Sequence, residues 1–164
     1  MDYFSESIKK AIRTVPDWPK PGVSFRDITT VLQDKTAFRK LIDAFVHRYH
    51  GQHIDAVAAV DARGFIIGSA LAYELNASLV LVRKKGKLPF DTLVEDYELE
   101  YGTDTLEIQQ DAIKPGQRVI VLDDLLATGG TMAASIELLT QIGANVEAAA
   151  FIIELTFLNG RDRL

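Results

Sequence analysis

A chain of 164 residues that is 48 % hydrophobic and 25 % charged has the size and composition of one globular domain with a single core. Its formal net charge of −5 argues against general nucleic-acid binding, and no apolar run approaches the roughly 18 residues of a membrane span. The chain has no cysteine, and its first residues lack the basic and apolar regions of a signal peptide. We therefore expect a cytoplasmic protein whose partners are neither a membrane nor a nucleic acid.

The first part of the chain predicts a helix followed by an extended arm. Between residues 5 and 15 the apolar residues share one helical face. Prolines at positions 16, 19 and 21 then prevent a helix from continuing, so residues 22–25 are expected to be extended. Helical periodicity returns between Phe38 and Tyr49, where the apolar residues form a one-sided stripe.

Two strand–helix–strand units follow and determine the expected fold class. The first comprises residues 55–60, 64–75 and 78–82, and the second comprises residues 119–122, 131–142 and 146–153. In each unit two apolar runs predict strands, and the segment between them has helical periodicity. This alternation implies an α/β fold in which helices cover both faces of a parallel sheet.

A polar stretch from Lys84 to Gln117 separates the two units. Its alternating apolar residues, at positions 97–101 and 106–108, predict a β-hairpin, and a long excursion of this kind is typical of an active-site lid. Glu98 and Glu100 share one face of the first hairpin strand, opposite Leu99. Their spacing alone favours a face turned to solvent. The alternative is a carboxylate over a closed site, where it orients or deprotonates a nitrogen nucleophile.

The run from Val119 to Thr131 carries the strongest functional signal. Four apolar residues predict a buried strand that ends at Asp123 and Asp124, and a loop then delivers Thr-Gly-Gly-Thr directly before a helix. The glycines let backbone N–H groups approach a ligand closely, and the helix start attracts negative charge. The carboxylates accept hydrogen bonds from hydroxyl groups. A ribose 5-phosphate suits both halves, whereas a nucleoside-triphosphate loop is excluded because no Lys-Ser/Thr pair follows the last glycine. The alternative is an ordinary strand–turn–helix with solvent-facing aspartates.

Two other predicted strands also end in groups that suit an anion. Asp61-Ala62-Arg63-Gly64 follows the strand of residues 55–60 and opens a helix, and Arg63 supplies a fork of donors suited to phosphate oxygens. Residues 83–87, Arg-Lys-Lys-Gly-Lys, follow the strand of residues 78–82. Taken singly, these segments are also compatible with a surface arginine and a solvated loop. Taken together, the three strand ends predict a site for a sugar phosphate and a second, more highly charged phosphate group.

Six segments of the sequence resemble one known family. Residues 119–131 resemble the phosphoribosyl-pyrophosphate signature of the type I phosphoribosyltransferases, and the form Leu125-Leu126-Ala127 resembles its adenine-specific branch. Residues 21–28, 61–65, 83–89, 97–102 and 154–156 match further motifs of that branch in the same order, so that the resemblance extends from about Ile8 to Leu164. It implies one domain, residues 1–164, with a parallel twisted sheet flanked by helices. An N-terminal hood of residues 1–33 and a flexible hairpin lid of residues 87–110 are also implied.

The resemblance also implies a reaction and a set of site residues. The reaction is transfer of the phosphoribosyl group of phosphoribosyl pyrophosphate to adenine, giving AMP and pyrophosphate, by a homodimer. The implied cofactor is Mg²⁺, carried mainly by the substrate pyrophosphate and not by protein ligands. Arg63 and Glu100 would be catalytic, with Glu100 accepting a proton from the purine. The binding residues would be Ala127, Thr128, Gly129, Gly130 and Thr131 for the 5-phosphate, Asp123 and Asp124 for the ribose, Asp61, Ala62, Arg63, Gly64, Lys84 and Lys87 for pyrophosphate, and Ser24, Phe25, Arg26 and Leu155 for adenine.

One departure and two alternatives accompany this hypothesis. Ala62 stands where many members of the family carry serine, which removes a hydroxyl group but keeps the backbone donors. The family also tends to have a non-proline cis peptide between the first two residues of the 61–64 loop. A transferase for another purine, such as hypoxanthine, guanine or xanthine, is the first alternative. The second is a non-catalytic regulator that senses phosphoribosyl pyrophosphate and binds nucleic acid.

Overall fold

The computed structural model describes residues 3–98 and 102–164. These fall into two compact units, residues 1–48 and residues 49–164, and each unit is described by itself. Whether the chain acts as the single domain expected from its sequence, with a hood of residues 1–33 and a lid of residues 87–110, stays a prediction. Within the described ranges, no helix has both the length and the apolar character needed to span a membrane.

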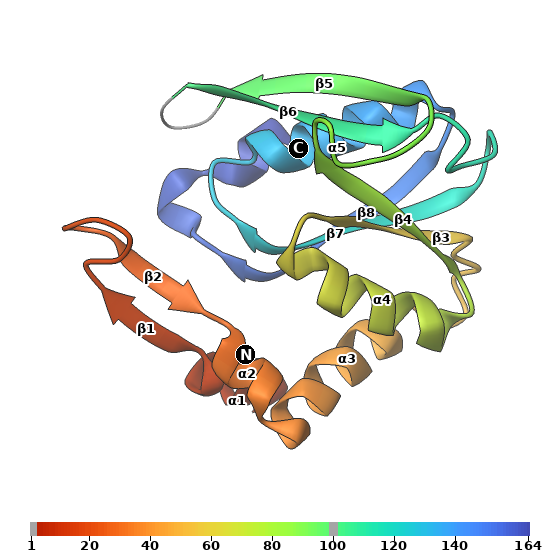
Figure 1. The fold of residues 1–164 in the computed structure, drawn as a ribbon. Helices are drawn as coiled ribbons and strands as arrows, with labels where there is room; N and C mark the ends of the chain where they lie inside the picture. The colour runs from red at the N-terminus through yellow and green to blue at the C-terminus, as the bar shows by residue number, and fades with distance from the viewer. Residues whose placement is uncertain (1–2, 99–101) are drawn as a thin grey trace. The chain divides into compact units, whose positions relative to one another are not determined.

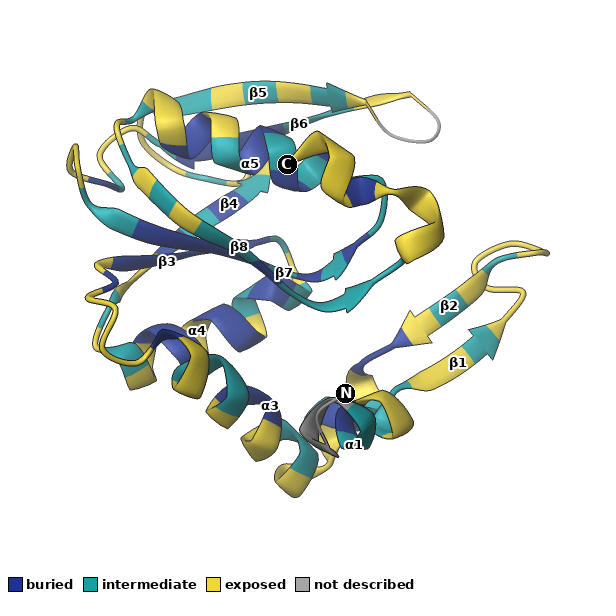
Figure 2. Cartoon of the chain, turned by 180° about the vertical axis from the view of Figure 1, so that it is seen from behind, coloured by how far each residue is buried: buried dark blue, intermediate teal, exposed yellow. Residues whose placement is uncertain are grey.

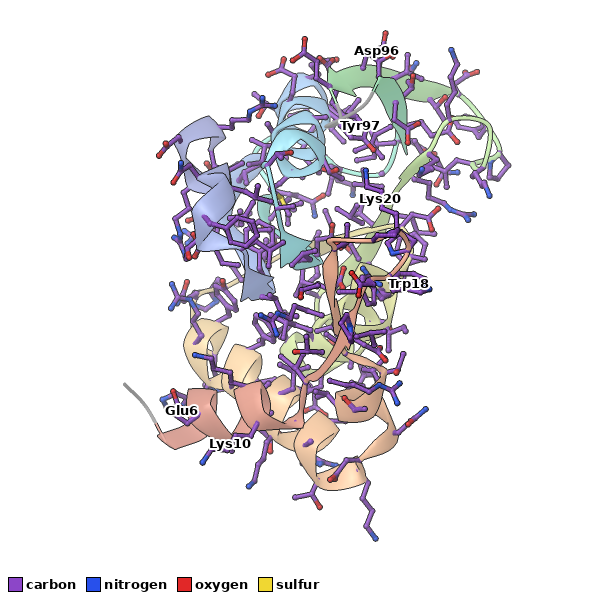
Figure 3. The ribbon with its side chains drawn as sticks, turned by 90° about the vertical axis from the view of Figure 1, so that its left-hand side faces the viewer. Glu6, Lys10, Trp18, Lys20, Asp96 and Tyr97 are labelled. Carbon is purple, nitrogen blue, oxygen red and sulfur yellow. The ribbon has the colours of Figure 1, made fainter. Side chains whose placement is uncertain are left out.

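The first unit contains short helices and one β-hairpin. Its elements are α1 (Tyr3–Ala11), β1 (Arg13–Pro16), β2 (Ser24–Asp27), α2 (Thr29–Gln33) and α3 (Lys35–Tyr49), whose last residue belongs to the second unit. β1 and β2 are antiparallel, with Val15 opposite Phe25. Trp18, in the turn between them with Lys20, packs its ring edge-on against Phe25 at a centroid distance of 4.4 Å (Figure 3). The arm predicted to be extended is therefore one side of a hairpin.

The first helix is shorter than the sequence predicted. It ends at Ala11, and residues 13–15, expected to belong to the helix, pair with β2 instead, together with Pro16. Pro16 explains the difference, because a residue before proline is driven toward extended backbone. The hairpin is also held by an ion pair of 2.5 Å between Arg13 Nη2 and Asp27 Oδ2.

The second unit is built on a six-stranded sheet in the order β5-β6-β4-β3-β7-β8 (Figure 1). The strands are β3 (Ala56–Val60), β4 (Ser78–Lys84), β5 (Thr92–Glu98), β6 (Thr103–Gln109), β7 (Arg118–Leu126) and β8 (Asn145–Glu154). β3 is parallel to β4 and β7, and β7 is parallel to β8. The helix α4 (Arg63–Leu75) contacts β3, β4 and β7, whereas α5 (Gly130–Gln141) contacts β5 to β8. The two predicted strand–helix–strand units are confirmed.

The core of this unit lies around its central strands. Every residue of β3 is buried, as are residues 119–122 of β7 (Figure 2). Such strands are apolar along their whole length because helices cover both faces of the sheet. Ile67 and Leu71 of α4, and Leu138 and Leu139 of α5, are fully buried. This packing fixes the carboxyl ends of the parallel strands, where the candidate site lies.

Two features of the sheet differ from the prediction or extend it. The strand expected to stop at Leu122 continues through both aspartates to Leu126, because β8 supplies partners as far as Glu154. The predicted hairpin is present as β5 and β6, and β6 also pairs with β4, with Lys84 opposite Leu106. The hairpin is thus part of the central sheet. After β8 the chain forms the short 3₁₀ helices η1 (Thr156–Leu158) and η2 (Gly160–Arg163).

Candidate functional site

The three predicted anion-binding segments line one cavity at the carboxyl ends of β3, β4 and β7. Its volume is about 420 Å³. Its lining residues are Val60, Asp61, Ala62, Arg63, Lys84, Tyr97, Leu106, Asp123, Asp124, Leu125, Ala127 and Thr131. Open α/β sheets bind ligands at this edge, because the loops that follow parallel strands converge there. The structure therefore brings together residues predicted to bind 5-phosphate, ribose and pyrophosphate, while their individual roles stay predictions.

Asp123 and Asp124 form a carboxylate pair on one side of the cavity, with Asp123 half-buried and Asp124 buried. Asp124 is only 4 % exposed, and its Oδ2 lies 2.7 Å from Nε of Arg63. The backbone N–H of Asp124 donates to Oδ1 of Asp123 at 2.8 Å. Burial, reinforced by the neighbouring charge of Asp124, raises the pKa of Asp123. Asp123 is therefore more readily protonated than a free carboxyl, and in its protonated form it can donate as well as accept hydrogen bonds.

The loop of residues 61–64 is packed tightly against β7. The peptide bond between Asp61 and Ala62 is cis, as the family resemblance implied. Gly64 lies in the first turn of α4, and a Cβ at this position would lie 2.9 Å from the carbonyl oxygen of Leu122 and 3.3 Å from Cα of Asp123. Glycine is required there because no side chain fits between the loop and the strand. This close approach holds Arg63 beside Asp124.

The cations after β4 have different surroundings. Arg83 donates from Nε to Asp61 Oδ2 and from Nη1 to the carbonyl oxygen of Lys87, each at 3.1 Å. Arg83 therefore supports the loop of residues 61–64. Lys84 does line the cavity, and its Nζ lies 2.7 Å from Asp104 Oδ2 on β6. Lys87 is exposed and does not line the cavity. The structure therefore does not bring Lys87 together with the other residues predicted to bind pyrophosphate.

A buried carboxylate organises the turn that carries these cations. Glu107, only 3 % exposed, accepts hydrogen bonds from the backbone N–H groups of Lys87 at 2.7 Å and Leu88 at 2.6 Å. Burial alone would raise the pKa of Glu107, but hydrogen bonds from the backbone of residues 86–88 outweigh it and lower the pKa below its ordinary value. Glu107 was not singled out from the sequence, where it is one polar residue in an alternating strand.

The residues predicted to bind the 5-phosphate, 127–131, join β7 to α5 and are called the phosphate cradle below. Gly129 has φ of +86°, a conformation that favours glycine, and Gly130 begins α5. The backbone N–H groups of this first turn are the usual anion donors at a helix start. A Cβ at Gly129 would collide with the carbonyl oxygen of Gly160, and Arg163 Nη1 lies 3.6 Å from the position of a Cβ at Gly130. The segment η2 therefore lies against the cradle.

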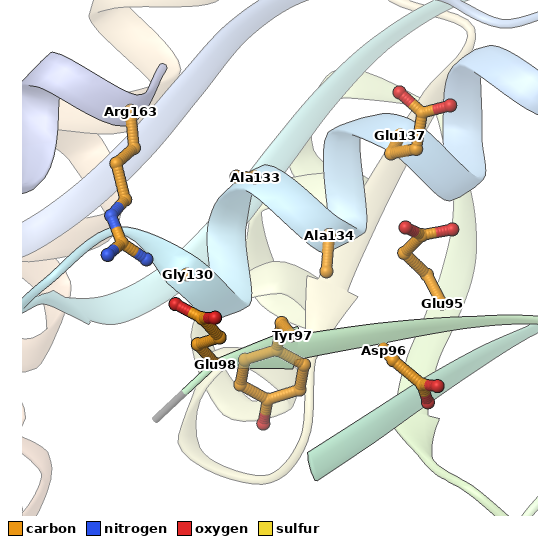
Figure 4. A pocket seen from close by; sticks show the side chains of 9 residues that line it. All are labelled: Glu95, Asp96, Tyr97, Glu98, Gly130, Ala133, Ala134, Glu137 and Arg163. Carbon is orange, nitrogen blue, oxygen red and sulfur yellow. The ribbon is translucent and has the colours of Figure 1, made fainter. Parts of the chain in front are cut away.

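A second cavity, of about 380 Å³, lies beside the cradle (Figure 4). β5 and α5 form its walls, and the guanidinium of Arg163 points toward Gly130 at one end. The sequence carried no signal for Gly160 or Arg163, because both contacts join segments separated by the whole of α5 and β8. The lining residues are Glu95, Asp96, Tyr97, Glu98, Gly130, Ala133, Ala134, Glu137 and Arg163.

The residues predicted to bind adenine are distributed over both units. Ser24, Phe25 and Arg26 lie in β2 of the first unit, where Arg26 Nη1 donates to Thr14 Oγ1. Leu155 lies in the second unit, directly after β8, and its N–H donates to the carbonyl oxygen of Leu126 at 2.9 Å. A base site formed by these residues stays a prediction. Glu100, the predicted proton acceptor, lies outside the described residues.

Comparison with known proteins identifies the class first. The family model for the phosphoribosyl transferase domain matches residues 29–160. That range contains the whole parallel part of the sheet and every residue that lines the 420 Å³ cavity. The chain thus has the fold of the phosphoribosyltransferases and belongs to that class.

Individual relatives narrow the class further. The adenine phosphoribosyltransferase of Marinobacter nauticus is 80 % identical over 164 residues, which are 100 % of this chain and 91 % of the relative. The crystal structure of the enzyme from Rhodothermus marinus is 52 % identical with a TM-score of 0.93, covering 98 % of this chain and 92 % of that one. The enzyme from Saccharomyces cerevisiae, complexed with adenine and an imino-altritol bisphosphate, has a TM-score of 0.94 at 40 % identity, covering 98 % and 94 %. The chain belongs to the adenine phosphoribosyltransferase family.

Proposed function

We propose that this chain transfers the 5-phosphoribosyl group of phosphoribosyl pyrophosphate to adenine, producing AMP and pyrophosphate in purine salvage. The observation that carries the proposal is the single cavity in which a helix start, a carboxylate pair and two cations meet. These are the groups needed for a 5-phosphate, ribose hydroxyls and a pyrophosphate. The adenine bound to the relative from Saccharomyces cerevisiae supports the choice of base.

The sugar end of the substrate is assigned to the cradle and the carboxylate pair. The N–H groups of residues 127–131 and the start of α5 would bind the 5-phosphate. Asp123 and Asp124 would accept hydrogen bonds from the ribose hydroxyls. As pyrophosphate departs, C1′ acquires positive charge, and nearby negative charge then stabilises the transition state more than the ground state.

The leaving group is assigned to the opposite side of the cavity. The bond between C1′ and the pyrophosphate oxygen breaks, and the electron pair leaves with pyrophosphate. Arg63 and Lys84 would stabilise the charge that develops on it, together with N–H groups of the 61–64 loop. A purine nitrogen then bonds to C1′, and Glu100 would accept the proton that this nitrogen loses. Excluding water protects the activated sugar from hydrolysis.

The residues of the cavity fit a Mg²⁺ ion that enters with its substrate. Among residues 3–98 and 102–164, no group of three or more carboxylate or imidazole side chains is placed to enclose a metal. Mg²⁺ is commonly held by one or two carboxylates together with substrate phosphates. Asp61, Asp123 and Asp124 line the cavity and would be the carboxylates available to such a complex. When bound, Mg²⁺ neutralises charge on the pyrophosphate.

Residues 24–26 and Leu155 would bind the base, as the family resemblance implies, and the active form would be a cytoplasmic homodimer. An assay that offers adenine, hypoxanthine, guanine and xanthine separately, with phosphoribosyl pyrophosphate and Mg²⁺, tests the assignment. We expect pyrophosphate release with adenine alone. Release of pyrophosphate with hypoxanthine but not with adenine would show that hypoxanthine, and not adenine, is the substrate. No release with any base, together with an electrophoretic shift of nucleic acid at physiological salt, would favour the regulator. Sedimentation of the same sample tests the dimer.

A further inference from the structure

Two residues of the β5–β6 hairpin already engage groups that the proposed function assigns to substrate phosphates. Asp104 Oδ2 on β6 lies 2.7 Å from Nζ of Lys84. Tyr97 on β5 donates from its hydroxyl to the same Asp104 oxygen at 3.4 Å, and this hydroxyl is also hydrogen-bonded to the side chain of Thr131. Asp104 and Tyr97 thus link Lys84, which is assigned to pyrophosphate, to the hydroxyl of Thr131 in the phosphate cradle.

The hairpin reaches the cradle through its backbone as well. The carbonyl oxygen of Glu98 lies 2.8 Å from the position of a Cβ at Gly130, and Tyr97 Cδ2 lies 3.5 Å from it. Figure 4 shows Tyr97 and Glu98 beside the start of α5. Asp96 and Tyr97 point to opposite sides of β5, so that Tyr97 is turned inward and Asp96 is exposed (Figure 3).

We propose that Asp104 is a positioning residue that occupies the ammonium group of Lys84 before substrate binds and competes with pyrophosphate for it. This inference rests on the proposed function, which assigns Lys84 to pyrophosphate. A carboxylate and a phosphate oxygen are both anionic acceptors, so Nζ of Lys84 exchanges one for the other as substrate enters. Tyr97 would act on Thr131 in the same way: its hydroxyl is hydrogen-bonded to that of Thr131 and competes with the 5-phosphate for it.

The contact has the properties of an exchangeable pair. The side chain of Lys84 is 59 % exposed and that of Asp104 is 26 % exposed, so water reaches both. Exposed ion pairs contribute little, and the competition is therefore expected to weaken substrate binding by about two- to fivefold. Asp104 thus sets the affinity for phosphoribosyl pyrophosphate without touching the reacting atoms.

Calorimetric titration of phosphoribosyl pyrophosphate with Mg²⁺ into the full chain tests the proposal. Asp104→Asn is expected to lower the Kd about two- to fivefold, and to lower the KM for this substrate in parallel, with little change in kcat. Asp96→Asn is the matched control: it removes the same charge from the same hairpin, but Asp96 Oδ1 accepts from Thr105 Oγ1 at 2.6 Å on the exposed side. The control is expected to bind like the unmodified chain.

A second pair of variants separates competition from a general change in the hairpin. In a Lys84→Met background, Asp104→Asn is expected to leave the Kd unchanged, because the contested cation is absent. Tyr97→Phe, which keeps the ring and removes the hydroxyl, is expected to lower the Kd in the unmodified background. This variant tests the corresponding competition at Thr131, and it does so even if Asp104→Asn does not fold.

The outcomes distinguish this inference from the proposed function. An unchanged or higher Kd in Asp104→Asn, in a chain that still forms AMP from adenine, overturns the competition and leaves the function standing. An equal fall in Kd for Asp96→Asn also overturns it, because the effect is then one of net charge. If the unmodified chain neither binds phosphoribosyl pyrophosphate nor forms AMP, the proposed function itself fails.

Discussion

Gly64→Ala tests whether the loop of residues 61–64 must lie directly on β7. The added methyl group would stand 2.9 Å from the carbonyl oxygen of Leu122 and 3.3 Å from Cα of Asp123. Both are backbone atoms of a buried strand and cannot rotate away, so the loop must move by a few tenths of an ångström. Overpacking of this kind costs about 1–3 kcal/mol, which lowers the Tm by about 2–12 °C in a chain of this length.

The same displacement is expected to reduce activity, because Arg63 is the next residue along the loop. Its 2.7 Å contact with Asp124 would lengthen, and misplacing a charged group within an active site by a fraction of an ångström is expected to lower kcat/KM about tenfold. Thermal unfolding and steady-state AMP formation measure the two effects. Ser69→Ala is the control on the same helix, because it removes an exposed hydroxyl that donates to the carbonyl oxygen of Ile66. The free energy of unfolding of this variant should stay within about 0.5 kcal/mol of that of the unmodified chain. A Gly64→Ala variant that matches this control in Tm and in kcat/KM would refute the reasoning.

Three further variants test other parts of the site. Glu100→Gln is expected to slow AMP formation while leaving the calorimetric Kd for phosphoribosyl pyrophosphate intact, and unchanged turnover would remove Glu100 from the mechanism. Glu107→Gln is expected to cost about 1–3 kcal/mol of unfolding free energy at neutral pH, because a buried carboxylate that accepts backbone hydrogen bonds is lost. Since the folded state lowers the pKa of Glu107, its contribution is present above the ordinary pKa of 4.5 and is lost as pH falls through the lower folded value. Chemical denaturation at pH 7 and below pH 4 should show that difference shrink, and a constant difference would contradict it. Arg63→Met should lower the Tm more than Lys84→Met. The first variant removes the partner of Asp124, whose side chain is only 6 % exposed, whereas water reaches both members of the Lys84–Asp104 pair. Equal shifts in Tm would contradict this ranking.

The sequence predicted most of what local pattern determines. The apolar runs located β3, β4, β7 and β8, and the polar groups after them lie together because parallel strands end at one edge of the sheet. The predicted ends of helices and strands were less accurate where pairing between strands, and not the local residue pattern, determines the backbone conformation. β7 continues past Asp123 because β8 is long enough to pair with it, and residues before Pro16 pair with β2 instead of extending the first helix.

What the sequence did not predict depends on contacts between distant segments. Asp104 and Glu107 look alike as polar residues of an alternating strand. In the fold, Asp104 meets a lysine of β4, and Glu107 meets the backbone of the turn that follows β4. Both contacts arise because β6 pairs with β4, and nothing in either segment specifies that pairing. Arg163 likewise reaches the cradle from η2, a segment that follows β8 in the chain.

An acidic chain that binds a highly anionic substrate has to hold its cations in place without letting them repel one another. Here three of them are each paired with a carboxylate: Arg63 with Asp124, Arg83 with Asp61 and Lys84 with Asp104. The carboxylates of the two arginine pairs are largely buried and come from the strand ends themselves, so those pairs are part of the scaffold. The lysine pair is more exposed and its carboxylate comes from the hairpin. Under the proposed function the cations therefore have different roles: the arginines are held in place by their largely buried partners, and the lysine is the cation whose partner a phosphate would replace.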